Sequence, residues 1–319
     1  MCIAAWTWQA HPAYGLLLLF NRDEFHSRPT RPAQWWAAAG EGEEILGGKD
    51  ELGGGTWLGC TKGGKLAFLT NVREPSPRVG ARSRGELPVR FLQHAIVVSN
   101  VILAYDADST SSFKFKIGGL PLLNDLFNLQ VTSPFDFPYI WEGRQGPLEY
   151  ATEIAKEADQ YNGFNLVLAD VRSGTMVYIS NKPGDAPVVQ TVSPGCHVLS
   201  NAAIDSPWPK VLRLGQSFNG FLAAHDDAEV SLKQMVEELM TDTVKADRSV
   251  VPDTGVDPDW EYELSSIFID TKKGQARYGT RSMAAIGVKL DGEVTFYEKS
   301  LASSLWNENV VQFEMEMAQ

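Results

Sequence analysis

The 319-residue sequence contains no run of about 20 consecutive apolar residues, the length that a membrane-spanning helix needs. Its apolar run at residues 16–20 is also too short for a signal peptide, and no basic region precedes it. These absences predict an intracellular, cytoplasmic protein without a transmembrane segment. Peripheral association with a membrane stays open.

Cysteine and histidine are scarce as well. Cys2, Cys60 and Cys196 form an odd set without close spacing, which indicates a reducing compartment and excludes a disulfide framework or a cysteine-rich zinc site. The five histidines lack the spacing of metal ligands, and there is no Cys-x-x-Cys-His motif for covalent haem attachment. We therefore predict no metal site and no required cofactor.

Positive charge is in deficit, because 28 Lys and Arg stand against 40 Asp and Glu. The resulting net charge of −12 repels phosphate backbones and argues against a nucleic-acid partner. Residues 73–90 depart from this average and carry five arginines: Arg73, Arg78, Arg82, Arg84 and Arg90. Such a segment is either a solvated loop or an attractor for a small anionic or acylated ligand.

Short strand-like segments with turns between them dominate what is present. Strands are predicted at residues 3–8, 14–20, 35–39, 57–61, 65–70, 164–169, 175–180, 195–200, 264–270, 282–289 and 294–299. Helical periodicity is confined to residues 147–161, 208–224 and 232–244. The excess of hairpins predicts an α+β domain with antiparallel sheets and helices on the outside.

Residues 94–145 fit neither period. A structureless stretch of this length is rare inside a compact domain. We predict a single domain, residues 1–319, into which residues 94–145 are inserted as a poorly ordered segment that the fold does not need. A family-specific lobe is the alternative.

The cysteine at position 2 is the first candidate for chemistry. Removal of Met1 would leave a thiol and a free α-amine on Cys2, and an amine with a pKa of about 8 can act as the base for its own thiol. This pattern is typical of an N-terminal nucleophile, which predicts a solvent-reachable Cys2 with a lowered pKa. A buried cysteine at a strand end is the alternative.

Polar residues follow the strand predicted at residues 14–20. If this strand forms a hairpin with residues 3–8, its end lies beside the start of the first strand. Cys2 would then meet Arg22, whose charge suits a thiolate, and Asp23, whose carboxylate suits an α-amine. A surface ion pair after a strand is the alternative.

Three further polar residues lie at predicted strand ends. The side-chain amides of Asn71 and Asn201 suit an oxyanion hole, and the guanidinium of Arg281 suits a thiolate or a carboxylate. Residues of these types are also common in turns.

Eight short strings in a fixed order resemble the transport and Golgi organisation protein 2 family, whose members are also called NRDE proteins. The strings are Met1-Cys2-Ile3, Asn21-Arg22-Asp23-Glu24-Phe25 with Arg28-Pro29, Gly54-Gly55-Thr56-Trp57-Leu58-Gly59, Leu69-Thr70-Asn71-Val72-Arg73, Arg84-Gly85-Glu86-Leu87, Tyr161-Asn162-Gly163-Phe164-Asn165-Leu166, Leu199-Ser200-Asn201-Ala202 and Tyr278-Gly279-Thr280-Arg281-Ser282. They span nearly the whole chain apart from residues 94–145.

The resemblance implies an N-terminal nucleophile hydrolase-like fold, a four-layer αββα sandwich of antiparallel sheets. It also implies chemistry similar to that of cysteine amidases acting on bile-salt-like or penicillin-like amides. The residues that it implies are Cys2 as nucleophile, Arg22 and Asp23 as its partners, Asn71 and Asn201 as amide positions, and Arg281 as a second arginine.

The family is further associated with Golgi organisation, protein secretion, mitochondria, and haem and lipid homeostasis. For haem, His26 is a candidate axial ligand, with a bland exposed histidine as the alternative. Two main functions stay open. One is hydrolysis of an amide or thioester by Cys2, and the other is carriage of haem or an acyl ligand without catalysis. A scaffold in secretory trafficking is a third.

Overall fold

The computed structural model describes residues 2–37, 43–93, 145–182, 184, 186–225 and 229–316. The predicted insertion, residues 94–145, lies outside the described residues except for Gln145.

Two antiparallel sheets of seven strands each form the centre of the structure. Sheet A runs in the order β10 (Gly195–Leu199), β1 (Ile3–Trp8), β2 (Tyr14–Phe25), β12 (Ala276–Lys289), β13 (Glu293–Ala302) and β14 (Leu305–Glu314), with β11 (Asp270–Lys273) paired to β12. Sheet B runs in the order β3 (Thr30–Trp36), β4 (Ile45–Asp50), β5 (Leu58–Cys60), β6 (Lys65–Asn71), β7 (Phe164–Asp170), β8 (Thr175–Ser180) and β9 (Val188–Thr191).

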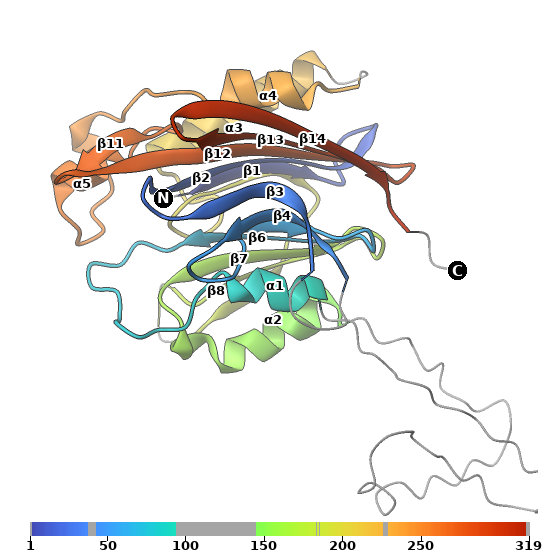
Figure 1. Ribbon diagram of the computed structural model, residues 1–319, viewed down its shortest axis with the longest axis horizontal. Helices are drawn as coiled ribbons and strands as arrows, with labels where there is room; N and C mark the ends of the chain where they lie inside the picture. Colours follow the sequence, from blue (N-terminus) through green and yellow to red (C-terminus); the bar gives the residue numbers. More distant parts are fainter. Residues whose placement is uncertain are drawn as a thin grey trace, which may run out of the picture. The chain divides into compact units, whose positions relative to one another are not determined.

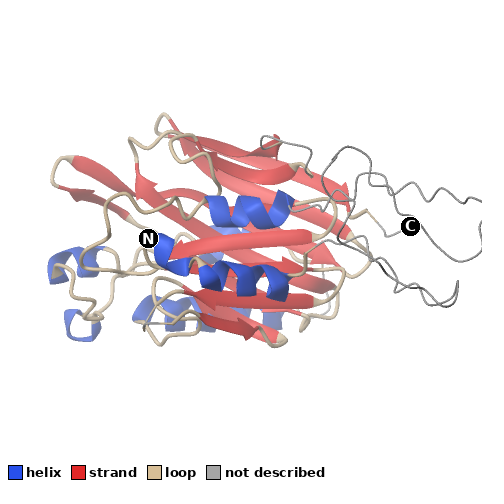
Figure 2. Ribbon diagram, turned by 90° about the horizontal axis from the view of Figure 1, so that it is seen from below, coloured by secondary structure: helices blue, strands red, loops and turns tan. Residues whose placement is uncertain are grey.

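Helices cover the outer face of each sheet, so the layers run helix, sheet, sheet, helix (Figure 1). Sheet A carries α3 (Pro209–Ala224) and α4 (Leu232–Leu239), and α5 (Pro258–Glu263) lies at its end beside β11. Sheet B carries α1 (Glu86–Gln93) and α2 (Pro147–Lys156), which lie on its outer face, toward the viewer in Figure 2. The α+β, four-layer αββα sandwich of antiparallel sheets is therefore confirmed. None of the described helices combines the length and the apolar character needed to cross a membrane.

The side chains of β1 point alternately to the two faces of sheet A and so contribute to two separate apolar cores. Trp6 and Trp8 belong to the apolar core between the two sheets, whereas Ile3 and Ala5 belong to the core between sheet A and its helices. Because successive side chains of a strand point to opposite faces, a strand buried on both sides must be largely apolar. Five of the six residues of β1 meet this requirement, and the exception, Thr7, is also buried.

The strand β2 is longer than predicted. It was expected to end at Phe20, but it continues to Phe25 because β12 supplies pairing partners as far as Tyr278. Arg22 and Asp23 are therefore residues of a strand, with side chains fixed on opposite faces of sheet A, and not part of a turn.

The prediction of a strand at residues 264–270 is wrong. Leu264 and Ile269 are buried by packing against Tyr278, while strand pairing begins at Asp270. The predicted helix at residues 232–244 ends at Leu239. Six of the described α-helices and strands have no counterpart in the sequence prediction, namely α1, α5, β4, β9, β11 and β14.

A buried carboxyl group links the two sheets. Glu298 of β13 is 2% exposed, and its Oε2 accepts the N–H of Ala33 of β3 at 2.6 Å. A register shift in β3 between Arg31 and Gln34 takes this N–H out of the β3–β4 ladder. Burial raises the pKa of Glu298 to about 7, so the group holds its proton at pH values where an exposed glutamate is ionised.

We expect Glu298→Gln to stabilise the protein increasingly as pH rises. Unfolded Glu298 ionises near its usual pKa of 4.5, whereas the folded group holds its proton up to about 7, so wild-type stability falls across this interval. Glutamine has no proton to lose, so the variant should gain on the order of 2 kcal/mol relative to wild type between pH 4.5 and pH 8.

Urea unfolding at pH 4.5 and pH 8 measures this gain. The control is Glu314→Gln, which removes a glutamate from an exposed position on β14. An equal difference between Glu298→Gln and wild type at both pH values would contradict the expectation.

Candidate functional site

A cavity of about 330 Å³ lies where β1 begins, and we call it the Cys2 cavity. Cys2, which precedes β1, lines it together with Arg22 and Asp23 of β2 and Asn71, the last residue of β6. Asn201 does not line the cavity but is hydrogen-bonded to a residue that does. Arg281 and His26 line two other cavities, which we describe below.

Strand register brings Cys2 and Arg22 together. In the β1–β2 hairpin Ile3 pairs with Asn21, so Cys2, one residue earlier, lies beside Arg22. The backbone N–H of Asp23 donates a hydrogen bond to the Cys2 thiol. The meeting of these three residues through hairpin register therefore agrees with the sequence prediction.

The Cys2 thiol is less accessible than predicted. Cys2 is 7% exposed and belongs to the apolar core between the sheets. Burial raises the pKa of the thiol above its usual 9.0, although the Asp23 N–H and the Arg22 charge act in the opposite direction. In the chain that carries Met1 the thiol is therefore neither solvent-reachable nor of lowered pKa, because desolvation outweighs both neighbours. For the chain without Met1, the solvent-reachable thiol with a lowered pKa stays a prediction.

The Arg22 side chain lies between the sheets. Its guanidinium is 4.1 Å from the ring centroid of Trp57, and its Nη2 is 3.9 Å from Asp50 Oδ2. The buried Nη1 has no hydrogen-bond partner among the described residues. A buried guanidinium nitrogen without an acceptor is costly, so this atom is available to a ligand oxygen.

The Asp23 carboxylate points to the opposite face of sheet A. Its Oδ1 accepts the Thr280 hydroxyl at 2.7 Å. Burial raises the pKa of Asp23 to about 6, against the opposing influence of Lys210, Thr280 and Arg22. The ammonium of Lys210, in the first turn of α3, is itself buried and donates to the Leu264 carbonyl at 3.1 Å. Sequence reasoning missed both Thr280 and Lys210 as neighbours of the site.

The two predicted asparagines have different positions. Asn201 Nδ2 donates to the Asn71 carbonyl at 2.6 Å, and its Oδ1 lies 2.9 Å from the Ser200 hydroxyl. Asn201 thus ties the end of β10 in sheet A to the end of β6 in sheet B. The Asn71 side chain has no hydrogen bond recorded among the described residues and lies on the cavity wall. Asn71 is the better placed of the two amides to meet a ligand.

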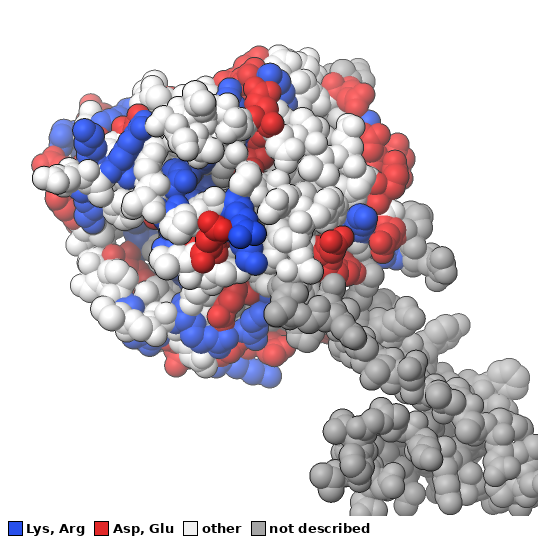
Figure 3. Space-filling model, in the orientation of Figure 1, with Lys and Arg blue, Asp and Glu red and all other residues white. Residues whose placement is uncertain are grey.

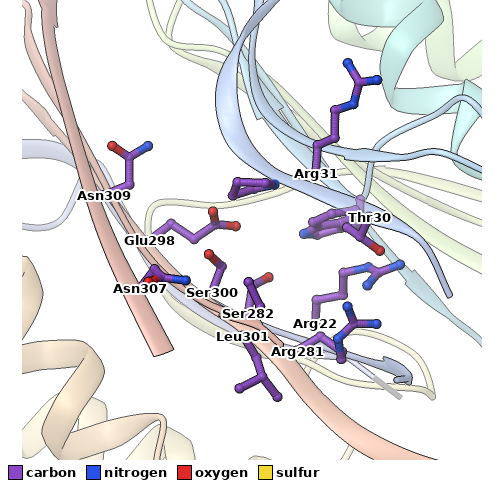
Figure 4. A pocket seen from close by; sticks show the side chains of 13 residues that line it. Arg22, Thr30, Arg31, Arg281, Ser282, Glu298, Ser300, Leu301, Asn307 and Asn309 are labelled. Carbon is purple, nitrogen blue, oxygen red and sulfur yellow. The ribbon is translucent and has the colours of Figure 1, made fainter. Parts of the chain in front are cut away.

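Arg281 occupies a β-bulge in β12, between Thr280 and Ser282, where the pairing with β2 shifts. Its Nη1 donates to the carbonyls of Phe25 at 2.9 Å and Arg28 at 3.1 Å. Bulges redirect a side chain out of the regular alternation. Here the side chain reaches a second cavity, of about 320 Å³, which we call the β13 cavity (Figure 4).

The position of His26 does not favour haem. Its cavity has a volume of about 120 Å³, below the roughly 300–1,000 Å³ of typical ligand pockets. Cys2 lines a different cavity and cannot serve as a second ligand at the same place. The described residues around His26 therefore do not fit a haem group.

The arginine-rich segment contributes to the Cys2 cavity through Arg82 and Arg84. Arg82 is paired with Glu157 at 2.8 Å. Arg84 donates to the Gly163 carbonyl at 2.9 Å, burial lowers its pKa, and no carboxylate lies within ion-pair distance among the described residues. The segment is not a continuous loop, because α1 begins at Glu86.

A glycine contact holds Arg84 at the cavity. The Thr56 N–H donates to the Gly85 carbonyl at 3.0 Å, and a Cβ on Gly55 would lie 2.2 Å from the Gly85 carbonyl carbon. Only glycine fits at position 55, so this glycine of the string beside Trp57 is a packing requirement.

On the face of the molecule shown in Figure 3, Lys and Arg side chains are interspersed with Asp and Glu.

Comparison with known sequences gives a consistent result. The family model described as Transport and Golgi organisation 2 matches residues 1–130 and 136–303. The chain is 32% identical to the Transport and Golgi organization protein 2 homolog of Homo sapiens over 332 residues, covering 99% of this chain and 100% of the relative. It is 25% identical to Transport and Golgi organization protein 2 of Drosophila melanogaster over 337 residues, covering 98% of each.

Among solved structures, the chain is similar to a C2A mutant of conjugated bile acid hydrolase from Clostridium perfringens, with a TM-score of 0.39 and 9% identity over 99% of this chain and 97% of the other. It is also similar to an N-acylethanolamine-hydrolyzing acid amidase ortholog from Caenorhabditis elegans, with a TM-score of 0.34 and 12% identity over 83% of this chain and 98% of the other.

We expect the three thiols to be alkylated at different rates in protein whose intact mass includes Met1. Cys196 is exposed and should react first, whereas Cys2 should be at least about tenfold slower because it is buried and protonated. Cys60 is buried with a pKa of about 12 and should be last. Iodoacetamide labelling at pH 7.5 followed by peptide mass spectrometry measures the order. Cys2 reacting as fast as Cys196 would refute the burial argument.

Proposed function

The chain belongs to the Transport and Golgi organisation 2 family, and from this premise we propose that Cys2 is the nucleophile of a hydrolase acting on amide or thioester bonds. The observation that carries the proposal is the Cys2 thiol, hydrogen-bonded by the Asp23 N–H in a cavity that Arg22 and Asn71 also line. The relatives' names refer to transport and Golgi organisation, and we extend this cellular setting to the chain as part of the proposal.

The chemistry begins after removal of Met1, when the α-amine belongs to Cys2. The amine takes the thiol proton while Sγ attacks the substrate carbonyl carbon, and the carbonyl oxygen becomes an oxyanion. The Asn71 amide and Arg22 Nη1 are the donors available to that oxyanion. The protonated amine then gives its proton to the leaving nitrogen or sulfur, and the bond to the acyl carbon breaks. Water hydrolyses the resulting thioester on Cys2, which releases a carboxylic acid and restores the thiol.

The raised pKa of the resting thiol is compatible with this sequence of steps. A neutral thiol survives in a buried position and becomes a thiolate only when the amine accepts its proton. The Asp23 N–H and the Arg22 guanidinium then stabilise the developing negative charge. Asp23 has the further role of orienting the α-amine, for which its carboxylate must be ionised.

The cavity favours a substrate with an anionic group. Arg84 is half-buried and has no carboxylate partner within ion-pair distance among the described residues, so a ligand carboxylate, sulfonate or phosphate could pair with it. This arrangement supports the small anionic, acylated ligand expected from residues 73–90.

A carrier for an acylated anion is the second candidate function. It is favoured by the burial of Cys2, which keeps the thiol protonated and unreactive in the resting state. The two functions differ in turnover, because a carrier binds the ligand through Arg84 without forming a bond to Cys2.

We expect intact-mass analysis of the protein from its native host to show loss of Met1. Incubation with a small carboxylate-bearing thioester should then add one acyl group, which disappears with time as the acid is released. Cys2→Ala should acquire no acyl group, whereas Cys196→Ser should behave as wild type because Cys196 lies outside the cavity. Retention of Met1, or acylation that survives in Cys2→Ala, would exclude Cys2 as an N-terminal nucleophile. Ligand binding without acylation would favour the carrier.

The pH dependence of turnover should reveal the protonation of the Asp23 carboxylate. We expect kcat/KM to decrease below about pH 8, where the α-amine takes up a proton, and to fall more steeply through about 6, because Asp23 is protonated below its pKa of about 6. Thr280→Val removes the hydroxyl that stabilises the carboxylate and should move this midpoint upward by about 0.5–1 unit.

Thr271→Val is the matched control. The Thr271 hydroxyl also donates a hydrogen bond to a carboxylate, that of Glu263, the last residue of α5, but neither residue lines the Cys2 cavity. A midpoint that Thr280→Val leaves in place, in a variant whose melting temperature shows that it is folded, would remove Asp23 from the mechanism.

A further inference from the structure

A row of polar side chains crosses sheet A at the level of Cys2. Strand pairing joins Arg22 of β2 to Ser282 of β12, Ser282 to Ser300 of β13, and Ser300 to Asn307 of β14. Cys2 precedes the first β1–β2 pair and starts the row. The five residues thus form a line perpendicular to the strands, which we call the polar row.

The neighbouring row on the same face has a different character. Two positions further along each strand, Ala4 pairs with Phe20, Phe20 with Ala284, and Ala284 with Glu298. The first three of these residues belong to the apolar core between the sheets. The polar row therefore marks the boundary at which tight packing between the sheets stops.

Beyond this boundary lies the β13 cavity, of about 320 Å³. Arg22, Ser282, Ser300 and Asn307 all line it, and Figure 4 shows these side chains along one wall. The opposite wall includes Trp57 of the glycine-rich string and residues of β3 in sheet B. Exposure increases along the row, from 5% at Ser282 to an exposed Asn307.

The two cavities adjoin at one pair of side chains. Arg22 and Trp57 line both the Cys2 cavity and the β13 cavity, and the guanidinium stacks on the indole at 4.1 Å. The Nη1 of Arg22, which is buried and has no hydrogen-bond partner among the described residues, belongs to this pair. A ligand that reaches from one cavity to the other must pass the side chains of Arg22 and Trp57.

We propose that the polar row is the floor of a substrate groove that runs from Cys2 past Arg22 to Asn307 and takes a peptide-like chain bearing amide or hydroxyl groups. The inference rests on the proposed function for the reaction at Cys2 and adds the class of substrate. Neighbouring strands are about 4.8 Å apart, so the four steps of the row span about 19 Å. Its serine and asparagine side chains both donate and accept hydrogen bonds. An aliphatic chain lying over Ser300 and Asn307 would displace their water without offering a hydrogen-bond partner, which disfavours a lipid acyl chain. The Ser282 hydroxyl already has a partner in the carboxyl group of Glu298.

Direct binding tests the groove without relying on turnover. Isothermal titration of full-length Cys2→Ala protein compares two probes that share a succinyl group and carry either a triglycine amide or an alkyl tail of the same length. The triglycine probe should bind at least about tenfold more tightly, since it can satisfy two or more hydrogen bonds of the row. Ser300→Val, added to this protein, should weaken the triglycine probe about fivefold and not the alkyl probe. Asn307→Leu, at an exposed position, should act in the same way.

The control is Thr295→Val, which removes a hydroxyl from β13, the strand that also holds Ser300. Thr295 lines a different cavity together with Tyr14 and Tyr297. The control variant should change neither affinity. Equal or tighter binding of the alkyl probe, no loss in Ser300→Val and Asn307→Leu, or no binding of either probe would each overturn the groove. Because the assay measures binding in a protein without Cys2, its outcome is separate from whether wild-type protein hydrolyses thioesters.

Discussion

The register of β2 between β1 and β12 is the constraint on which the candidate site depends. Because side chains alternate along a strand, Arg22 faces the space between the sheets and Asp23 faces the helices. A slip of one residue would exchange the two groups and bury each charge in the wrong surroundings. Asn21 opposes such a slip, since its buried Nδ2 donates to the carbonyls of Met240 at 2.9 Å and Ile267 at 3.1 Å.

Hydrogen bonds between the two sheets fix the position of the sheet B wall of the site relative to the sheet A wall. The Thr70 hydroxyl of β6 donates to the Ser200 carbonyl, and Asn165 of β7 donates to the Ala202 carbonyl at 2.8 Å. Together with the amide of Asn201, these bonds hold the ends of sheet B against the end of β10 next to Cys2. Buried polar groups are costly unless paired, so such a network tolerates little relative movement of the two sheets. The cavity walls are correspondingly well defined in position.

Much of the central fold could be predicted from the sequence, because periodic burial leaves a local pattern. The apolar run at residues 16–20 in β2 and the Gly63-Gly64 turn before β6 depend on neighbours in the chain. The edge strand β14 could not be predicted, since none of its side chains is fully buried and they leave only a weak periodic pattern. The convergence of Cys2, Arg22 and Asp23 followed from hairpin geometry. Hairpin geometry could not find three further neighbours of the site. Lys210 reaches it through the packing of α3, Thr280 through the bulged strand β12, and Trp57 from the side of sheet B.

The position of Cys2 has a practical consequence for the preparation of this protein. The residue stands at the first position before a central strand, with β10 and β2 on either side, and is 7% exposed. Any affinity tag or residual protease-site sequence fused ahead of it must leave the sandwich through the same confined end that forms the Cys2 cavity. Tagged material is therefore a different molecule at the point where its chemistry is to be examined, and purification handles belong at the C-terminus.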